Sequence, residues 1–401
     1  MDPFADIRPY RDDEVPLVVR RLLADCTLVK AIEKHRFPGF PAFLQPLTSW
    51  LVRYSLRHNL GSVRSVDDVQ NRMASFVRRV VKNSITDLTF AGFDTLPHNE
   101  ACLFISNHRD IAMDPALLNF ALHETGHGLV EIAIGDNLLD DPLIADIMRL
   151  NRSFVVPRSV EGHKARLLAL TRLSDYIGHT LTHGRSIWIA QREGRAKDGL
   201  DRTDPALIKM LFIHWRKRGF SLSDAIRSLR IVPVAIAYEY DPCDLLKARE
   251  LLASEGGGYV KQAGEDINSL LEGIAGQKGR VHIACGTPLT GSFADATAVA
   301  AAIDRQIHST YRLFPSNILA CERLLDEASP DALPLPVRVA DLRQLMDHLR
   351  RDWERFEPGG MIRHATLFGQ RLAGQSEKLR DLMLAMYANP VFSRLPANTA
   401  K

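Results

Sequence analysis

The sequence predicts an α/β fold, in which a mostly parallel central sheet is flanked by helices and helical regions stand at both ends of the chain. Two observations support this prediction. Between residues 85 and 290, seven short apolar runs alternate with helical patterns, as in folds with a parallel sheet. On either side, apolar residues recur at spacings of three and four. We therefore expect a helical N-terminal region over 1–84, an α/β domain over 85–290, and a helical C-terminal region over 291–401.

The composition is that of an ordinary globular protein. Of 401 residues, 46% are hydrophobic and 25% are charged, and the formal net charge is +3. This charge gives no strong field that would indicate nucleic acid as a partner. The five cysteines are scattered without CxxC spacing, which is typical of reduced thiols in the cytoplasm. No apolar run approaches about 18 residues and the N-terminus has no apolar signal core, so we expect a cytoplasmic protein that meets any membrane from its surface.

The N-terminal region carries two helix patterns. Ser65 and Asp68 predict a capping box that opens a helix over 66–81. The basic end of that helix favours a cation-rich C-terminus packed on the core and leaves open an interfacial helix facing anionic lipid. Its basic residues are Arg78, Arg79 and Lys82. The preceding stretch, 40–58, predicts an amphipathic helix. Its apolar face consists of Phe43, Leu44, Leu47, Trp50, Leu51 and Tyr54.

The remaining elements follow from the same patterns. The expected strands are residues 88–90, 102–106, 130–134, 154–156, 186–190, 231–237 and 281–284. The expected helices between them include 115–123, 142–150, 162–183 and 205–217. Towards the C-terminus we expect helices over 295–311, 338–355 and 362–387, with a proline-rich link over 330–336. Because reactive groups in parallel sheets gather at the carboxyl ends of strands, polar residues at those positions are the candidates for chemistry.

The segment 104–118 places such residues directly after a strand. The strand ends at Ser106, Asn107 and His108 follow, and Asp114 stands before Pro115, a favoured first residue of a helix. Asp114 is therefore expected to cap the helix. A carboxylate at this distance can hold one nitrogen of the imidazole, so that the other accepts a proton from a hydroxyl. The same residues also fit a loop histidine and an ordinary helix-capping aspartate.

Basic residues follow two further apolar runs, 154–156 and 186–190. They are Arg158, Arg192, Arg195 and Lys197. In a parallel sheet they would converge near His108 and suit a phosphate, which arginine grips with paired hydrogen bonds. Taken singly, each is more often a surface charge.

The order of these segments resembles the glycerolipid acyltransferases, the group with glycerol-3-phosphate and 1-acylglycerol-3-phosphate acyltransferases. Asn107, His108 and Asp114 resemble its first block, 154–158 its second, Glu193 with Gly194 its third, and 231–236 its fourth. The resemblance covers residues 85–290. Two departures stand out: five residues instead of four separate the histidine and aspartate, so Met113 occupies the usual aspartate position, and Arg-Glu-Gly-Arg replaces Pro-Glu-Gly-Thr-Arg.

The resemblance implies a mechanism and its residues. His108 would be the general base and Asp114 would orient it. Glu193 would bond the glycerol hydroxyl or its own loop, and Gly194 would allow close backbone approach and a donor to the oxyanion. The residues implied in substrate binding are Asn107, Arg158, Arg192, Glu193, Gly194, Arg195 and Lys197. The donor would be acyl-CoA or acyl carrier protein, and the acceptor glycerol 3-phosphate or a lysophospholipid at the cytoplasmic membrane surface, with no cofactor or metal.

Two rival functions are considered. His123-Glu-Thr-Gly-His127 matches the HExxH pattern of zinc metalloproteases, but Gly126 and Gly128 disfavour the helix it needs. The altered spacing at Asp114 motivates the other rival, a lipid- or membrane-binding protein that keeps the fold without the chemistry.

Overall fold

The computed structural model describes residues 2–37, 41, 45–97, 100–139, 141–255, 257, 265–327 and 338–395. Phe43, Leu44 and the predicted link 330–336 lie outside the described residues. The chain divides into two compact units. The smaller comprises Met1–Phe76 and Val130–Tyr176, and the larger comprises Val77–Leu129 and Ile177–Lys401. The three-region division drawn from the sequence stays a prediction.

The larger unit is built on five adjacent strands. Their order is β1 (Ile85–Ala91), β7 (Gly279–Cys285), β6 (Ile231–Tyr238), β2 (Leu103–Ser106) and β5 (Ile187–Ala190). Their pairings are parallel except that β6 and β7 are antiparallel. Every residue of β6 and β2 is buried, as expected of central strands covered on both faces. The carboxyl ends of β2, β5 and β6 therefore meet at one edge of the sheet.

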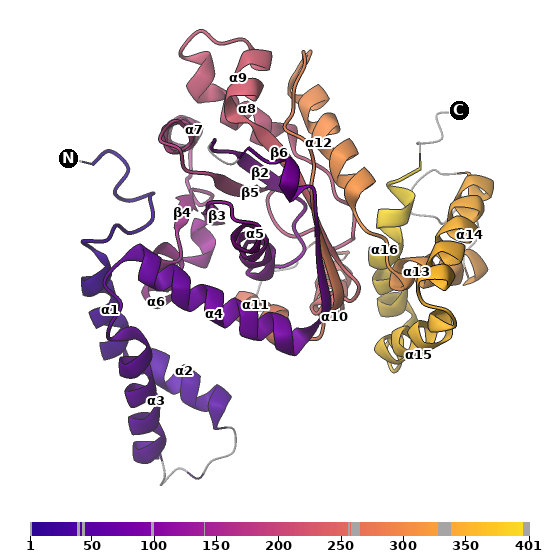
Figure 1. Cartoon of the computed structure of the whole chain (residues 1–401), viewed down its shortest axis with the longest axis horizontal. Helices are drawn as coiled ribbons and strands as arrows, with labels where there is room; N and C mark the ends of the chain where they lie inside the picture. The colour runs from indigo at the N-terminus through magenta and orange to yellow at the C-terminus, as the bar shows by residue number, and fades with distance from the viewer. Residues whose placement is uncertain are drawn as a thin grey trace. The chain divides into compact units, whose positions relative to one another are not determined.

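The smaller unit contributes two further strands, the parallel pair β3 (Glu131–Gly135) and β4 (Ser153–Val156). All seven strands coincide with predicted runs to within a few residues. Together with the helices around them they confirm the predicted α/β fold with a mostly parallel sheet (Figure 1).

Helices cover the sheet of the larger unit. They are α5 (Met113–Glu124), α8 (Pro205–Arg216), α9 (Leu222–Leu229), α10 (Asp244–Ser254), α11 (Glu265–Ala275) and α12 (Ala296–Thr310), with a short 3-10 turn at Phe93–Thr95. The first two and the last were predicted, whereas α9, α10 and α11 were not among the expected helices. In Figure 1, α12 runs alongside β6, which agrees with the contacts between them.

The C-terminal helices belong to the same unit. They are α13 (Pro315–Glu327), α14 (Val339–Phe356), α15 (Gly360–Leu372) and α16 (Glu377–Phe392), and α16 packs against both α10 and α13. The prediction of a single helix over 362–387 is wrong, because α15 ends at Leu372 and a separate helix begins at Glu377. Ala373 is extended and Gly374 has a φ of 75°, a left-handed conformation that ends a helix. The prediction missed this break because the apolar spacing continues across it.

The smaller unit has its own helical core. It contains α1 (Val15–Ala24), α2 (Cys26–Arg36), α3 (Gln45–Leu60), α6 (Pro142–Leu150) and the 3-10 turn Asp136–Leu138, while α4 (Val66–Ser84) and α7 (His163–Thr182) pass from one unit into the other. Buried side chains of α1 pack with Leu150 of α6. The capping box of α4 is confirmed: Ser65 Oγ accepts from the Asp68 N–H at 3.1 Å, and the Asp68 carboxylate accepts from the Ser65 N–H at 3.1 Å.

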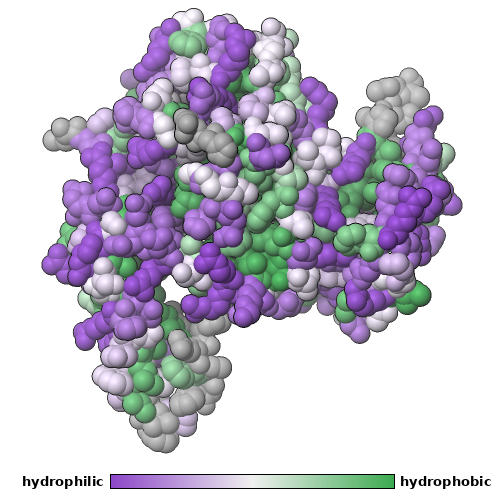
Figure 2. All heavy atoms as spheres, in the orientation of Figure 1, coloured by the Kyte–Doolittle hydropathy of each residue, from purple (hydrophilic) through white to green (hydrophobic). Residues whose placement is uncertain are grey.

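The predicted apolar face of α3 points to solvent in this unit. Its described members are Leu47, Trp50, Leu51 and Tyr54, all of them exposed, with Trp50 at 59% and Tyr54 at 61%. Trp50 and Tyr54 stack on one another with 5.7 Å between ring centroids. Figure 2 shows hydrophobic surface over the α2–α3 hairpin. Among the described helices, none combines the length and the apolar character needed to cross a bilayer.

Candidate active site

His108 and Asp114 form the centre of the candidate site. His108 lies two residues beyond the end of β2, and its Nδ1 is 2.9 Å from Asp114 Oδ2. The imidazole is 14% exposed and packs edge-on against Trp188 of β5, with 5.7 Å between ring centroids. Among the described residues, none hydrogen-bonds Nε2. One ring nitrogen is therefore held by a carboxylate while the other is available to a hydroxyl.

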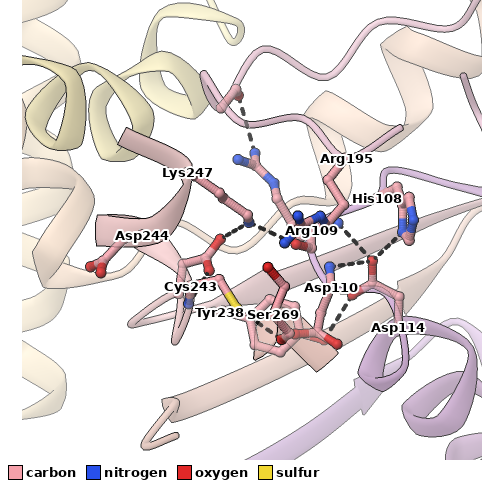
Figure 3. Close-up of polar contacts among 12 residues, drawn as sticks. His108, Arg109, Asp110, Asp114, Arg195, Tyr238, Cys243, Asp244, Lys247 and Ser269 are labelled. Atoms are coloured by element: carbon pink, nitrogen blue, oxygen red, sulfur yellow. Dashed lines mark hydrogen bonds and ion pairs between the residues drawn. The ribbon is translucent and has the colours of Figure 1, made fainter. Parts of the chain in front are cut away.

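Four donors hold the Asp114 carboxylate in place. Figure 3 shows Asp114 close to His108, Asp110 and Tyr238. Besides His108, its Oδ2 accepts from the backbone N–H groups of Arg109 at 2.6 Å and Asp110 at 2.9 Å. Its Oδ1 accepts from the Tyr238 hydroxyl at 2.8 Å. Tyr238 ends β6 and was not predicted, because no local pattern connects it to residues so far away in the chain. The carboxylate that orients His108 is thus itself oriented by the loop after β2 and by the last residue of β6.

The altered histidine–aspartate spacing is absorbed before the helix. α5 begins at Met113, so Asp114 lies in its first turn, and the prediction that Asp114 caps the helix is wrong. The N-cap is Ala112, and Asp110 closes the turn before it: its Oδ1 accepts from the N–H groups of Ala112 at 2.9 Å and Met113 at 2.8 Å. The extra residue is accommodated in the loop that Asp110 closes, and Asp114 still reaches His108.

The environment of Asp110 is unusual for a carboxyl group. Burial, and then the neighbouring Asp114 carboxylate, raise the pKa of Asp110 to about 6. The helix α11 packs closely on it, since a Cβ at Gly273 would lie 2.0 Å from Asp110 Oδ2. Burial also raises the pKa of Tyr238 well above its ordinary value, and the Asp114 carboxylate adds to this. Tyr238 is therefore a stable hydrogen-bond donor to Asp114.

Asn107 joins two strands at the edge of the site. Its side chain is fully buried, its Oδ1 accepts from the Ile236 N–H at 2.8 Å, and its Nδ2 donates to the Ile236 carbonyl at 3.0 Å. Nδ2 also approaches Asp201 Oδ2 at 3.3 Å. These contacts pin the end of β2 to β6. The implied role of Asn107 in binding substrate stays a prediction, and its amide has a structural task.

The loop between β5 and α8 lies against His108. The Ala196 N–H donates to the His108 carbonyl at 2.8 Å, and the Gln191 N–H donates to the Ser106 carbonyl at 2.8 Å. Gly194 in this loop has a φ of 75°, and nothing lies within 4 Å of a Cβ built there. The glycine is required by backbone conformation. The implied close approach of its backbone to a substrate and its donation to an oxyanion stay predictions.

The three basic residues of this loop already have acidic partners. Arg192 lies 3.6 Å from Asp198, Arg195 lies 3.9 Å from Glu250, and Lys197 forms a hydrogen-bonded ion pair with Glu250. Glu193 is exposed. The predicted role of these cations in binding substrate stays a prediction, and the sequence did not indicate their partner Glu250 of α10.

A buried network of charged side chains lies behind the loop that carries His108. Arg109 pairs with Asp201 at 2.6 Å, and burial of both leaves this pair in a site of low polarity. Lys247 of α10 donates to the Arg109 carbonyl at 2.7 Å and to the Asp241 carboxylate. Burial disfavours the charge of Asp241, but Lys247 outweighs it and lowers the pKa of Asp241 below its ordinary value. The loop that carries His108 is therefore held from behind by charged groups.

The C-terminal helices reach this network. Tyr387 of α16 donates to Asp244 at 2.8 Å and accepts from the Asp241 N–H at 2.9 Å. A Cβ at Gly199 would lie 2.1 Å from the Met386 carbonyl oxygen, so α16 also touches the loop after β5. No functional role for these helices follows from the sequence, yet α16 contacts the loop after β5 and the charged network behind His108.

Arg158, the remaining predicted phosphate ligand, lies in the smaller unit, beyond β4. Its N–H donates to Asp136 Oδ2 at 3.0 Å, and its guanidinium lies near Gly135. Its participation in the site of the larger unit stays a prediction.

The HExxH reading has no structural basis. α5 ends at Glu124, and Gly126 has a φ of 79°, so His123 and His127 do not lie on successive turns of one helix. The His127 ring is hydrogen-bonded to the Phe93 carbonyl at 2.9 Å. In the part of the chain that the structure describes, no group of three His, Cys, Asp or Glu residues is placed to hold a metal ion.

Comparisons with known proteins agree with this geometry. Residues 87–236 match the model of the Acyltransferase family, a range that includes the sheet edge, His108, Asp114 and the loop after β5. Among solved structures, the chain is similar to the 1-acyl-sn-glycerophosphate acyltransferase PlsC of Thermotoga maritima, at 14% identity and a TM-score of 0.38 over 79% of this chain and 99% of that one. No curated protein matches. Over residues 87–236 the chain is thus similar to the Acyltransferase family, in agreement with the resemblance found in its sequence.

Proposed function

We propose that this acyltransferase moves a fatty acyl group from a thioester, acyl-CoA or acyl carrier protein, to a hydroxyl of glycerol 3-phosphate or of a lysophospholipid such as 1-acylglycerol 3-phosphate. The observation that carries the proposal is the 2.9 Å contact between His108 Nδ1 and Asp114 at the end of a buried parallel strand. This contact leaves Nε2 available for proton transfer, as general base catalysis requires.

The transfer needs a single proton relay. The acceptor hydroxyl gives its proton to His108 Nε2 as its oxygen attacks the thioester carbonyl carbon. The tetrahedral species then expels the thiolate, the C–S bond breaks, and the imidazolium returns the proton to sulfur. Asp114 stabilises the imidazolium between these steps, because its carboxylate lies against Nδ1 throughout.

Recognition of the phosphate is assigned to the loop after β5. Arg195 and Lys197 follow the residue pair Glu193-Gly194, and the loop is hydrogen-bonded to His108 through Ala196. A phosphate bound there would lie near the general base. This supports an acceptor whose hydroxyl is close to a phosphate, as in glycerolipid precursors.

The test compares two histidine variants in an acceptor screen. Radiolabelled palmitoyl-CoA and palmitoyl carrier protein are offered with glycerol 3-phosphate, lysophosphatidate and lysophospholipids. His108→Ala should lower acyl transfer by about 10²–10⁴-fold, the usual contribution of a general base. His123→Ala, a half-exposed histidine at the end of α5, should transfer as the unaltered chain does. Full transfer by His108→Ala would favour a lipid-binding protein without this chemistry.

We further propose that the smaller unit attaches the protein to a membrane surface through α3. An exposed stripe of Leu47, Trp50, Leu51 and Tyr54 has the spacing of an interfacial helix. Transfer of such side chains into lipid is favourable by about 1.5–3 kcal/mol each. Leu47→Ser with Trp50→Ser should therefore release the protein from anionic vesicles in a sedimentation assay. Leu168→Ser, which alters an exposed leucine of α7, is the matched control, and equal binding of both variants would contradict the proposal.

A further inference from the structure

Glu250 lies between the two cations that follow Gly194. Its Oε1 is hydrogen-bonded to Lys197 Nζ, and its Oε2 lies 3.9 Å from Arg195 Nη2. All three side chains are largely withdrawn from solvent, with Arg195 7%, Glu250 14% and Lys197 30% exposed. Glu250 belongs to α10, beyond the range of the family match. One carboxylate from outside the family domain is thus shared by both cations.

Arg195 keeps donor capacity that Glu250 does not use. Its Nη1 is buried and has no hydrogen-bond partner among the described residues. Buried donors are nearly always paired, so Nη1 is left as a donor for a bound acceptor. The neighbouring cation, Arg192, is offset by Asp198 at 3.6 Å. The Arg195–Lys197–Glu250 cluster therefore combines two cations, one carboxylate and one unused donor.

The charges of this cluster discriminate between two kinds of phosphate. Two cations and one carboxylate leave a net charge of +1. A phosphodiester carries a single negative charge, whereas a phosphomonoester carries about 1.5 to 2 at neutral pH. The second charge of a monoester would face the Glu250 carboxylate across a poorly solvated space.

We propose that Glu250 is a specificity-determining residue that adapts this site to acceptors with a singly charged phosphate, namely lysophospholipids joined to a headgroup through a phosphodiester. This inference rests on the proposed function and narrows its acceptor class. Glu250 lowers the affinity for phosphomonoesters and holds Arg195 and Lys197 in place for a diester.

The test uses two short-chain acceptors that differ by one charge: 1-hexanoylglycerol 3-phosphate and its methyl phosphodiester. Isothermal titration of the full chain should give tighter binding of the diester, on the order of tenfold at about pH 8. Glu250→Gln should abolish or invert that preference. Glu255→Gln, at an exposed position just after α10, should keep it. At a pH of about 5.5 most of the monoester is protonated to a single negative charge, because its second pKa is about 6. The unaltered chain should then bind the two acceptors with more similar affinities.

Because the titration measures binding and not acyl transfer, the role of Glu250 can be tested separately from the proposed reaction. If neither acceptor is acylated but the charge preference depends on Glu250, the proposed reaction fails and the charge-selective site stands. If both are acylated and the unaltered chain binds the monoester as tightly as the diester, the inference is overturned while acyl transfer stands. A diester preference that persists in Glu250→Gln also overturns it. Because the unaltered chain alone gives the first comparison, a poorly folded variant does not decide the outcome.

Discussion

Replacing Asp114 by asparagine tests how much the carboxylate beside His108 contributes to catalysis. Asp114 receives four donors: His108 Nδ1 and the N–H groups of Arg109 and Asp110 on Oδ2, and the Tyr238 hydroxyl on Oδ1. An amide oxygen can take the place of Oδ2. The amide nitrogen then faces Tyr238, whose hydroxyl must turn to accept. The side chain therefore fits, but the negative charge beside the imidazole is lost.

The size of the effect follows from the charge. Two unit charges about 4 Å apart at an effective dielectric of about 20 attract by about 4 kcal/mol. The imidazolium exists only after proton transfer, so this attraction stabilises the transition state more than the ground state. Since about 1.4 kcal/mol corresponds to a tenfold change, kcat should fall by roughly 10³-fold.

The assay is single-turnover acyl transfer with the preferred acceptor, and the folded state is checked by thermal unfolding. Asp347→Asn, which alters an exposed aspartate of α14, is the control and should leave the rate unchanged. KM for the acceptor should also change little, because Asp114 is fully buried behind His108. A folded Asp114→Asn variant with kcat within tenfold of the unaltered chain would refute the assignment of Asp114 as the orienting carboxylate.

Three more changes probe the supports of the site. Tyr238→Phe removes the 2.8 Å hydrogen bond to Asp114. Because hydrogen bonds to charged groups contribute about 1.5–3 kcal/mol, kcat should fall about tenfold while KM stays the same. An unchanged kcat in steady-state kinetics would count against a supporting role of Tyr238. Gly199→Ala should lower Tm more than Gly194→Ala. Both glycines have a φ near 75–80°, a conformation that costs alanine about 1–2 kcal/mol. Only at Gly199 would the added Cβ also meet a carbonyl oxygen, that of Met386, at 2.1 Å. Equal losses of Tm in the two variants would exclude tight packing of α16 against Gly199. Asp110→Asn should gain stability relative to the unaltered chain as the pH rises from about 4 to about 6. Over that range native Asp110, with its raised pKa of about 6, holds a proton that the unfolded chain releases, so the unaltered chain loses stability. Urea unfolding at several pH values measures the difference in unfolding free energy between the two chains. A difference that does not change with pH would contradict the raised pKa of Asp110.

The sequence alone determined the framework of the larger unit and the centre of its site. Apolar runs between helical patterns located the five strands of this unit, most clearly β6, which is apolar over most of its length because it is buried on both faces. His108 and Asp114 could be singled out because they follow a strand and precede a helix, positions that a parallel sheet brings to its active edge. The capping box at Ser65 was equally accessible, because both its residues lie within one helical turn.

Only the tertiary structure decided which groups surround that centre. Tyr238 lies 124 residues from Asp114, Lys247 lies 138 residues from Arg109, and Glu250 lies 53 residues from Lys197. No periodicity or spacing encodes such pairs, since they arise when separate elements pack together. The same reason explains why α16 supports the loop at Gly199. Local pattern fixes where a reactive side chain stands along the chain, whereas its hydrogen bonds and the charge of its pocket depend on distant segments.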